Sequence, residues 1–282
     1  MTLNLTLKRF DISSMPDNST TILIGRRRVG KTTCLMDILY HKRRIPCGVV
    51  ISGTEESNHA FRGTVPDLFI YGEFKKEILE KLISRQQKLL KEMDKPDAPK
   101  VDPRCFIILD DVMYDRTIWK QEVIRKILMN GRHYHIYFMT TCQYLMDLPP
   151  AARTNLDYTV VMKEPILSNR QKIHQYFCGI VPEFKQFCSI MDATTANFEC
   201  LVVDNTSRGT EISDTLFWYK AKIRDPGTWR VGSTSFWKHH ERRYRDPSEA
   251  EDEQAEKSGI VINKTGTGKS GRRREKGKVA KK

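Results

Sequence analysis

A glycine-bounded turn near the N-terminus constrains this chain more than any other feature. Residues 25–32 read G-R-R-R-V-G-K-T and match the complete phosphate-binding loop pattern G-x-x-x-x-G-K-[ST]. The five preceding residues are apolar or β-branched, and Leu35, Ile38 and Leu39 follow at helical spacing. This strand–loop–helix context argues against a chance glycine turn, because the loop N–H groups and the helix N-terminus converge on phosphate oxygens. The pattern therefore predicts a nucleoside triphosphate site.

The loop residues have separate expected roles. Lys31 is expected to reach the β- and γ-phosphates, and the Thr32 hydroxyl is expected to bind Mg²⁺. The three arginines at the variable positions are expected to face solvent or a partner. The predicted ATP site comprises Gly25, Arg26, Arg27, Arg28, Val29, Gly30, Lys31, Thr32 and Thr33.

Two acids follow an apolar segment further along the chain. Residues 105–109 read C-F-I-I-L and predict a buried strand that ends at Asp110 and Asp111. We expect Asp110 to hold Mg²⁺ and Asp111 to orient and deprotonate the attacking water. The alternative is a helix N-cap beside a surface charge. The phosphate-binding loop upstream favours the catalytic interpretation.

Three polar residues lie around the strand predicted at 136–140. Gln143 follows this strand, where its amide would bond the γ-phosphate or the attacking water; the alternative is a solvent-facing side chain. Arg132 precedes the strand, and Arg153 precedes the strand predicted at 157–162. Either arginine would suit stabilisation of γ-phosphate charge from a neighbouring subunit, although single arginines are also common surface residues.

Apolar strand patterns alternate with helical patterns along the chain, which predicts an α/β fold with a mainly parallel central sheet flanked by helices. Long helices are expected at 77–93 and 118–130. Residues 198–203 and 216–221 predict a β-hairpin-like C-terminal extension. The periodic pattern fades from Arg224. Residues 1–223 are therefore assigned to a P-loop ATPase domain and residues 224–282 to a disordered tail.

Charge is concentrated in that tail. The net charge of the chain is +13; residues 246–256 carry six acids and no base, and residues 263–282 carry nine Lys or Arg against one acid. Such blocks with few aromatic residues are typical of disorder. A basic tail of this kind commonly binds a polyanion or directs nuclear import. The alternative is that the tail only keeps the protein soluble. The expected nucleic-acid contacts are Lys264, Lys269, Arg272, Arg273, Arg274, Lys276 and Lys278.

Cysteine content and apolar run length bear on the compartment. Seven cysteines without a C-x-x-C pair favour a reducing, intracellular environment over a disulfide framework or a zinc site. We expect no membrane span, because no apolar run reaches the ~20 residues that a bilayer requires.

Taken together, these motifs resemble the genome-packaging ATPases of nucleocytoplasmic large DNA viruses, a branch of the FtsK–HerA superfamily. The resemblance rests on the phosphate-binding loop, T-E-E-S-N at 54–58, F-I-I-L-D-D at 106–111, G-R-H at 131–133, Gln143 and R-T-N-L-D-Y at 153–158. It covers about residues 20–221 and leaves the tail out. Many superfamily members have Asp-Glu where this chain has Asp110-Asp111.

The resemblance implies an ATP- and Mg²⁺-dependent motor that moves double-stranded DNA into capsids. It implies a sensor role for Gln143 and, for Arg132, the role of an arginine finger that acts on a neighbouring subunit. Such a finger predicts a homo-oligomeric ring of about five or six subunits. It also implies action at sites of virion assembly in an infected cell, in cytoplasm or nucleus, or in the virion. The capsid partner is not identified.

Two other classes of protein fit parts of the sequence. One is another P-loop NTPase, such as a helicase or nucleotide kinase. A GTPase is disfavoured, because the N-K at 263–264 lacks the Asp of a guanine-reading N-K-x-D. The other class is a non-enzymatic DNA-binding assembly protein that keeps ATP as a structural ligand.

Overall fold

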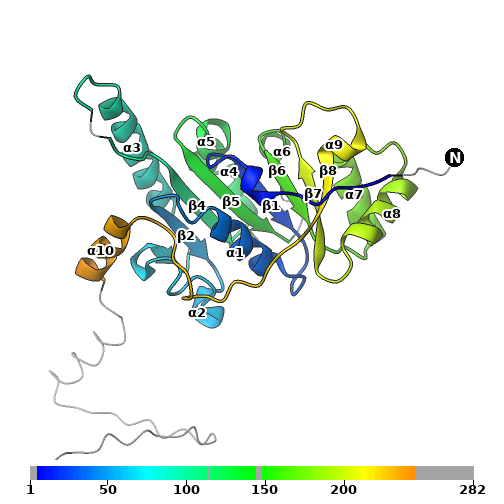
Figure 1. Cartoon of the computed structure of the whole chain (residues 1–282), viewed down its shortest axis with the longest axis horizontal. Helices are drawn as coiled ribbons and strands as arrows, with labels where there is room; N and C mark the ends of the chain where they lie inside the picture. The colour runs from blue at the N-terminus through cyan, green and yellow to red at the C-terminus, as the bar shows by residue number, and fades with distance from the viewer. Residues whose placement is uncertain (1–4, 99, 114, 144–147, 245–282) are drawn as a thin grey trace, which may run out of the picture. The chain divides into compact units, whose positions relative to one another are not determined.

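A single mixed sheet organises the part of the chain that the computed structural model describes, residues 5–98, 100–113, 115–143 and 148–244. Eight strands lie in the order β3-β2-β4-β5-β1-β6-β7-β8 (Figure 1). Neighbouring strands are parallel from β3 to β6, and β7 pairs antiparallel with both β6 and β8. The strands are β1 (Thr20–Ile24), β2 (Gly48–Ser52), β3 (Ile70–Tyr71), β4 (Cys105–Asp110), β5 (Ile136–Cys142), β6 (Tyr158–Val161), β7 (Glu199–Asp204) and β8 (Leu216–Lys220). The predicted α/β class and the C-terminal strand pair are confirmed.

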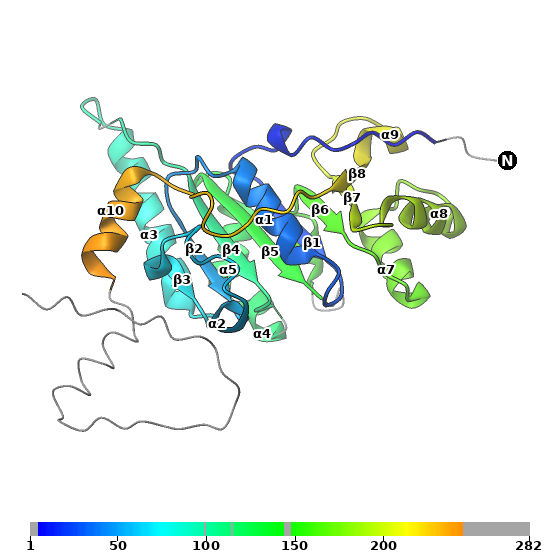
Figure 2. The ribbon, with the colours of Figure 1, turned by 60° about the horizontal axis from the view of Figure 1, so that its bottom comes forward.

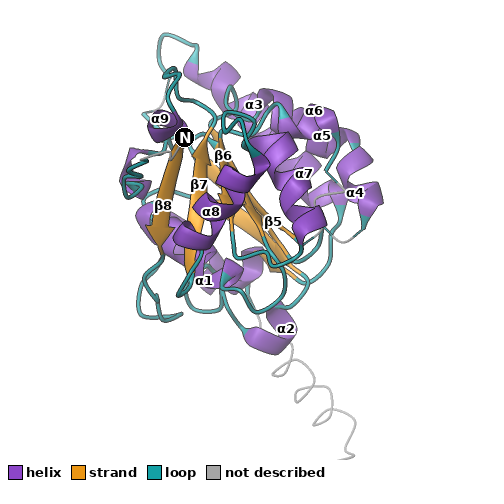
Figure 3. Cartoon of the chain, turned by 90° about the vertical axis from the view of Figure 1, so that its right-hand side faces the viewer, coloured by secondary structure: helices purple, strands orange, loops and turns teal. Residues whose placement is uncertain are grey.

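Helices cover both faces of the sheet, because the central parallel strands are apolar on both sides. Figure 3 shows α3, α5 and α7 on one side and α1 on the other. Each side has its own buried apolar cluster. The helical segments are η1 (Ile12–Ser14), α1 (Lys31–His41), α2 (Glu55–Asn58), η2 (Asp67–Phe69), α3 (Lys76–Met93), α4 (Arg116–Lys120), α5 (Glu122–Asn130), α6 (Pro150–Arg153), α7 (Leu167–Phe177), α8 (Phe184–Thr194), α9 (Ile212–Thr215) and α10 (Thr234–Arg243). No helix in the described ranges is long and apolar enough to cross a membrane.

The helix expected at 118–130 is divided in two. Gln121 is extended, with φ −62° and ψ 134°, and separates α4 from α5. The break redirects the chain so that Trp119 and Ile124, on either side of it, are both buried in the same apolar cluster. The apolar pattern is continuous across the break, so the pattern alone does not reveal it.

Residues 224–243 differ from the tail assigned to them, because they pack on the α1 side of the sheet. Gly232 and Ser233 donate backbone hydrogen bonds to the carbonyls of Arg43 and Pro46, at 3.0 and 2.8 Å. The Phe236 ring lies 4.4 Å from the Phe69 ring, measured between centroids. Aromatic anchors therefore hold a segment whose Gly and charge content suggests disorder. The compact unit ends at Arg243, and the tail assignment for residues 245–282 lies outside the described residues.

The segment 221–233, here called the strap, runs from β8 across α1 (Figure 2). The strap is hydrogen-bonded to Asp37 of α1, whose side chain is fully buried. Asp37 accepts hydrogen bonds from the Tyr219 hydroxyl (2.6 Å), the Lys222 backbone N–H (2.7 Å) and the Arg224 Nε (2.8 Å). Arg224 also stacks over Tyr40, 3.7 Å from the ring centroid. A buried carboxylate is tolerated only with such partners, so α1 and the strap are structurally coupled.

Candidate functional site

The phosphate-binding loop leaves the carboxyl end of β1 and enters α1. The Gly25 N–H donates to the Cys142 carbonyl at 3.1 Å, which ties the loop to β5. A Cβ on Gly25 would lie 2.6 Å from Met162 Cβ, so only glycine fits there. Gly30 has φ +93° and begins α1 in a left-handed conformation that favours glycine. Both motif glycines are thus explained by local packing and backbone geometry.

Lys31 occupies the first turn of α1 and is buried at 8% exposure. Its Nζ donates to the Arg26 carbonyl at 2.8 Å, across the loop. Burial lowers the pKa of Lys31, and the nearby carboxylates of Asp111 and Asp110 oppose this shift. A buried ammonium aimed across an anion-binding loop suits a phosphate contact.

Asp110 ends β4 and is 2% exposed. Its Oδ1 accepts a hydrogen bond from the Thr141 hydroxyl at 2.9 Å, while its buried Oδ2 has no hydrogen-bond partner among the described residues. Burial raises the pKa of Asp110 to about 6; Thr141 and Lys31 oppose the rise, Asp111 adds to it, and the nearby Thr32 hydroxyl lowers it slightly. An unpaired buried carboxylate oxygen beside a hydroxyl is a suitable donor set for Mg²⁺. These residues therefore fit the predicted metal site.

Asp111 and Gln143 are in contact at the tips of two neighbouring strands. The Gln143 side-chain amide donates to Asp111 Oδ1. Asp111 has φ +53°, a left-handed conformation that Asp tolerates better than most residues, and its N–H donates to Thr141 Oγ1 at 2.9 Å. The parallel register places Leu109 beside Thr140, which brings the two strand ends together. A carboxylate and an amide thus meet at the polar end of the cavity described below.

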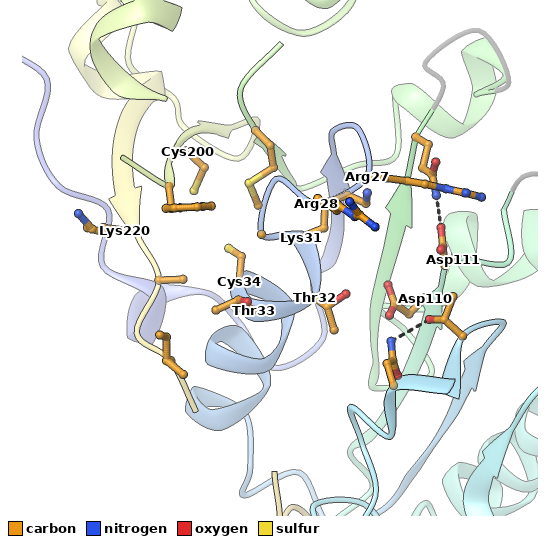
Figure 4. Close-up of a pocket in the computed structure, with 18 of the residues that line it drawn as sticks. Arg27, Arg28, Lys31, Thr32, Thr33, Cys34, Asp110, Asp111, Cys200 and Lys220 are labelled. Carbon is orange, nitrogen blue, oxygen red and sulfur yellow. Dashed lines mark hydrogen bonds between the residues drawn. The ribbon is translucent and has the colours of Figure 1, made fainter. Parts of the chain in front are cut away.

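Six of the nine predicted nucleotide residues line one open cavity of about 860 Å³, whereas Arg26 and Val29 line a neighbouring cavity and Gly25 lines neither. Figure 4 shows Asp110 and Asp111 on one side of the start of α1, and Cys200 and Lys220 on the other. The cavity therefore has two ends. The polar end contains Asp110 and Asp111, and the other end is formed by residues in and next to β7 and β8. The cavity is lined by Arg27, Arg28, Gly30, Lys31, Thr32, Thr33, Cys34, Thr54, Asn58, Asp110, Asp111, Gln143, Met162, Asn197, Phe198, Cys200, Lys220, Ala221 and Ile223.

The raised pKa of Asp110 gives a test of the metal site. Because its pKa is about 6, a proton competes with Mg²⁺ for the same carboxylate below that pH. We expect the apparent Mg²⁺ affinity of the nucleotide-bound chain to fall below about pH 6, approaching about tenfold per pH unit, as measured by calorimetric titration.

Asp110→Asn is the control for this prediction, because titration of the nucleotide itself affects both proteins equally. Without Mg²⁺ and above pH 6, this variant is expected to melt no lower than the wild type, since burial disfavours the carboxylate charge there. Equal pH slopes in the two proteins would contradict the assignment of Asp110.

Arg132 and Arg153 lie away from this cavity in the same chain. Arg132 precedes β5, and its guanidinium pairs with Asp157, just before β6. Asp157 also accepts from the Thr20 N–H at the start of β1, 2.8 Å away, so the group lies at the amino edge of the sheet. Arg153 stacks over Tyr176, 3.8 Å from the ring centroid. Both arginines line a separate cavity, so neither lines the phosphate site of its own subunit.

Several site residues were not predicted from the sequence. Thr141 binds both acids, and only its position near the end of β5 hinted at this. Thr54 and Asn58 line the cavity, whereas their neighbour Glu55 accepts the Phe61 N–H and supports the following turn. The predicted tail contacts lie outside the described residues.

Comparison with known proteins decides the family. The family model of the poxvirus A32 protein matches residues 7–207 of this chain. The chain belongs to the poxvirus A32 protein family. It is 33% identical over 241 residues to the uncharacterized protein L437 of Acanthamoeba polyphaga mimivirus, covering 84% of each chain. It is also 33% identical over 219 residues to the uncharacterized protein 015R of Frog virus 3, covering 77% of this chain and 66% of the relative.

A solved structure shares the fold of this A32 family member. The genome packaging NTPase B204 from Sulfolobus turreted icosahedral virus 2, in complex with ATP-gammaS, aligns with a TM-score of 0.51 and 17% identity. The alignment covers 74% of this chain and 100% of B204. The predicted P-loop ATPase fold and the resemblance to viral packaging ATPases are confirmed.

Proposed function

We propose that this A32 family protein hydrolyses ATP to move double-stranded viral DNA into capsids. One observation carries the proposal: Lys31, Asp110, Asp111 and Gln143 converge on a single cavity at the carboxyl edge of a parallel sheet. Family membership and the fold shared with a packaging NTPase support it. The site residues also include groups suited to binding phosphate and metal and to activating water, as phosphoryl transfer to water requires.

The residues divide the chemistry of hydrolysis among them. The loop N–H groups and Lys31 would hold the phosphates, and Thr32 and Asp110 would hold Mg²⁺. When bound there, Mg²⁺ would neutralise charge on the β- and γ-phosphate oxygens. Asp111 would accept the proton of a water whose oxygen attacks the γ-phosphorus, with ADP as the leaving group. Gln143, already bonded to Asp111, would orient that water.

A neighbouring subunit would complete this site. Arg132 and Arg153 lie at the amino edge of the sheet, opposite the phosphate-binding loop, so a head-to-tail contact is required to bring either one to a γ-phosphate. We therefore propose a closed ring in which Arg132 of one subunit contacts the γ-phosphate bound to the next subunit. Arg153 is the second candidate for this role.

The DNA contact and the place of action are further parts of the proposal. The grip on DNA would be electrostatic and largely independent of sequence, with the basic residues of 263–282 contributing. The protein would act at virion assembly sites inside the infected cell.

Stimulation of ATP turnover by nucleic acid tests this function. We expect duplex DNA to raise the rate of phosphate release more than single-stranded DNA, with no phosphate transfer to nucleosides. Stronger stimulation by single strands would favour a helicase, and transfer to a nucleoside would favour a kinase. Absence of turnover under every condition would favour an assembly protein that only binds ATP.

Removal of residues 257–282 tests the tail separately. The deletion removes the whole basic block of residues 263–282, so we expect weaker duplex affinity and a shallower dependence of log Kd on log salt concentration. Binding measured by fluorescence anisotropy between about 50 and 200 mM salt covers the informative range. An unchanged slope would contradict a role of the tail in DNA binding.

A further inference from the structure

The cavity continues beyond the phosphate-binding loop into an end that the hydrolysis chemistry does not use. This end, here called the apolar wall, consists of Met162, Phe198, Cys200, Ala221 and Ile223. It lies on the side of α1 away from Asp110, as Cys200 shows in Figure 4. The Phe198 ring is adjacent to the phosphate-binding loop, because its Cδ1 lies 3.8 Å from the Cβ position at Gly30.

Two side chains of the apolar wall are unusually exposed. Phe198 is 76% and Ile223 is 81% exposed, and the other exposed large hydrophobic residues in the described part of the chain range from 42% to 65%. Leaving an aromatic ring and a branched aliphatic chain in water forgoes burial energy. Both lie in the same cavity, next to a phosphate site, which indicates that a ligand covers them.

Local contacts set the backbone position of both residues. Asn197 and Phe198 have φ values of 51° and 61°, and such left-handed backbone is rare for a bulky residue. The Glu199 N–H closes this turn on the Ala196 carbonyl at 2.9 Å. Ile223 lies on the strap between Lys222 and Arg224, both of which bind Asp37. A ligand would therefore order two side chains whose backbone positions are already set.

We propose that Phe198 and Ile223 bind the base of the nucleotide and recognise it by stacking and apolar contact. The inference rests on the proposed function, since the phosphates must occupy the loop beside Gly30. Asn197 and Lys220 also line the cavity, but its only described acids are Asp110 and Asp111 at the polar end, so no carboxylate beside the apolar wall accepts the N1–H and amino group of guanine. Stacking on an aromatic face is tolerant of base identity. This chain consequently discriminates weakly between adenine and guanine.

Calorimetric titration of the full-length chain with Mg²⁺ and ATP-gammaS, GTP-gammaS or inorganic tripolyphosphate tests the inference. We expect Phe198→Ala to raise the Kd for ATP-gammaS about tenfold or more, because stacking on an aromatic side chain contributes strongly to base binding. Tripolyphosphate binding is expected to be unchanged. Phe198→Trp keeps a stacking face and is expected to keep the affinity. Wild-type Kd values for the two nucleotides are expected to agree within about fivefold.

Val101→Ala is the matched control, because it shortens an exposed apolar residue that does not line the cavity. Unchanged ATP-gammaS binding in Phe198→Ala, or an equal loss of tripolyphosphate binding, would overturn the proposal. So would a wild-type preference between the two nucleotides well beyond fivefold. A wild type that binds neither nucleotide nor tripolyphosphate would contradict the proposed function itself, and the base site with it.

Discussion

Lys31→Ala is expected to lower the rate of phosphate release at saturating Mg·ATP by about 100-fold or more, in line with loss of one preorganised group that stabilises transition-state charge. The ammonium is buried, spans the loop to the Arg26 carbonyl, and lies near both acids. No other lysine among the described residues lines the polar end of the cavity. Lys88→Ala, on the exposed face of α3, is the control and is expected to retain wild-type turnover.

The same variant shows whether subunits share a site. Arg132→Ala is expected to be inactive if its guanidinium acts in the next subunit. Mixing it with Lys31→Ala would then create interfaces that join an intact phosphate-binding loop to an intact arginine, and turnover would recover. Absence of recovery, in assemblies shown to contain both chains, would exclude Arg132 as the trans group; recovery with Arg153→Ala in its place would assign the role to Arg153.

Asp111→Asn is expected to lower turnover by about 10²–10⁴-fold, the usual contribution of general acid–base catalysis. Asparagine matches aspartate in size and tolerates the φ of +53°, so the backbone and the contact with Gln143 are retainable. The amide does not accept the proton of water. Affinity for Mg·ATP-gammaS is therefore expected to change little, and the effect should fall on kcat.

Asp115→Asn provides the comparison for Asp111→Asn. Asp115 is an exposed acid that caps α4, where it accepts the Thr117 N–H at 2.8 Å, and it does not line the cavity. This variant is expected to turn over ATP normally. Near-normal kcat in Asp111→Asn would mean that another group, or solvent, takes the proton.

The parts of the site that could be predicted from the sequence are those encoded within a few residues. The phosphate-binding loop carries its own glycines, Asp110 ends the largely apolar strand β4, and Gln143 follows β5, whose first four residues are apolar. Parallel strands place such ends at one edge, so the convergence of these residues follows from the predicted topology. Arg132 and Arg153, which precede their strands, lie at the opposite edge for the same reason.

The rest depends on contacts between distant segments, which local patterns do not encode. Thr141 resembles any other strand threonine until the register places it beside Asp110. The strap and α10 contain glycines and charges at irregular spacing, and they are ordered because Trp229, Phe236 and Asp37 give them partners on the α1 side. The sequence predicts that Phe198 is the first residue of an apolar strand. In the structure it precedes β7, has a φ of 61°, and lines the cavity.

The bonds made by Asp37 also affect how the protein is assembled. The helix that follows the phosphate-binding loop contains an acid whose partners are encoded about 180 residues later in the chain. A chain truncated before Tyr219 would lose these three hydrogen bonds and keep only His41, 3.9 Å away on the same helix, beside the carboxylate. An N-terminal fragment, or a nascent chain still on the ribosome, would therefore lack the contacts that join the nucleotide-binding helix to β8 and the strap.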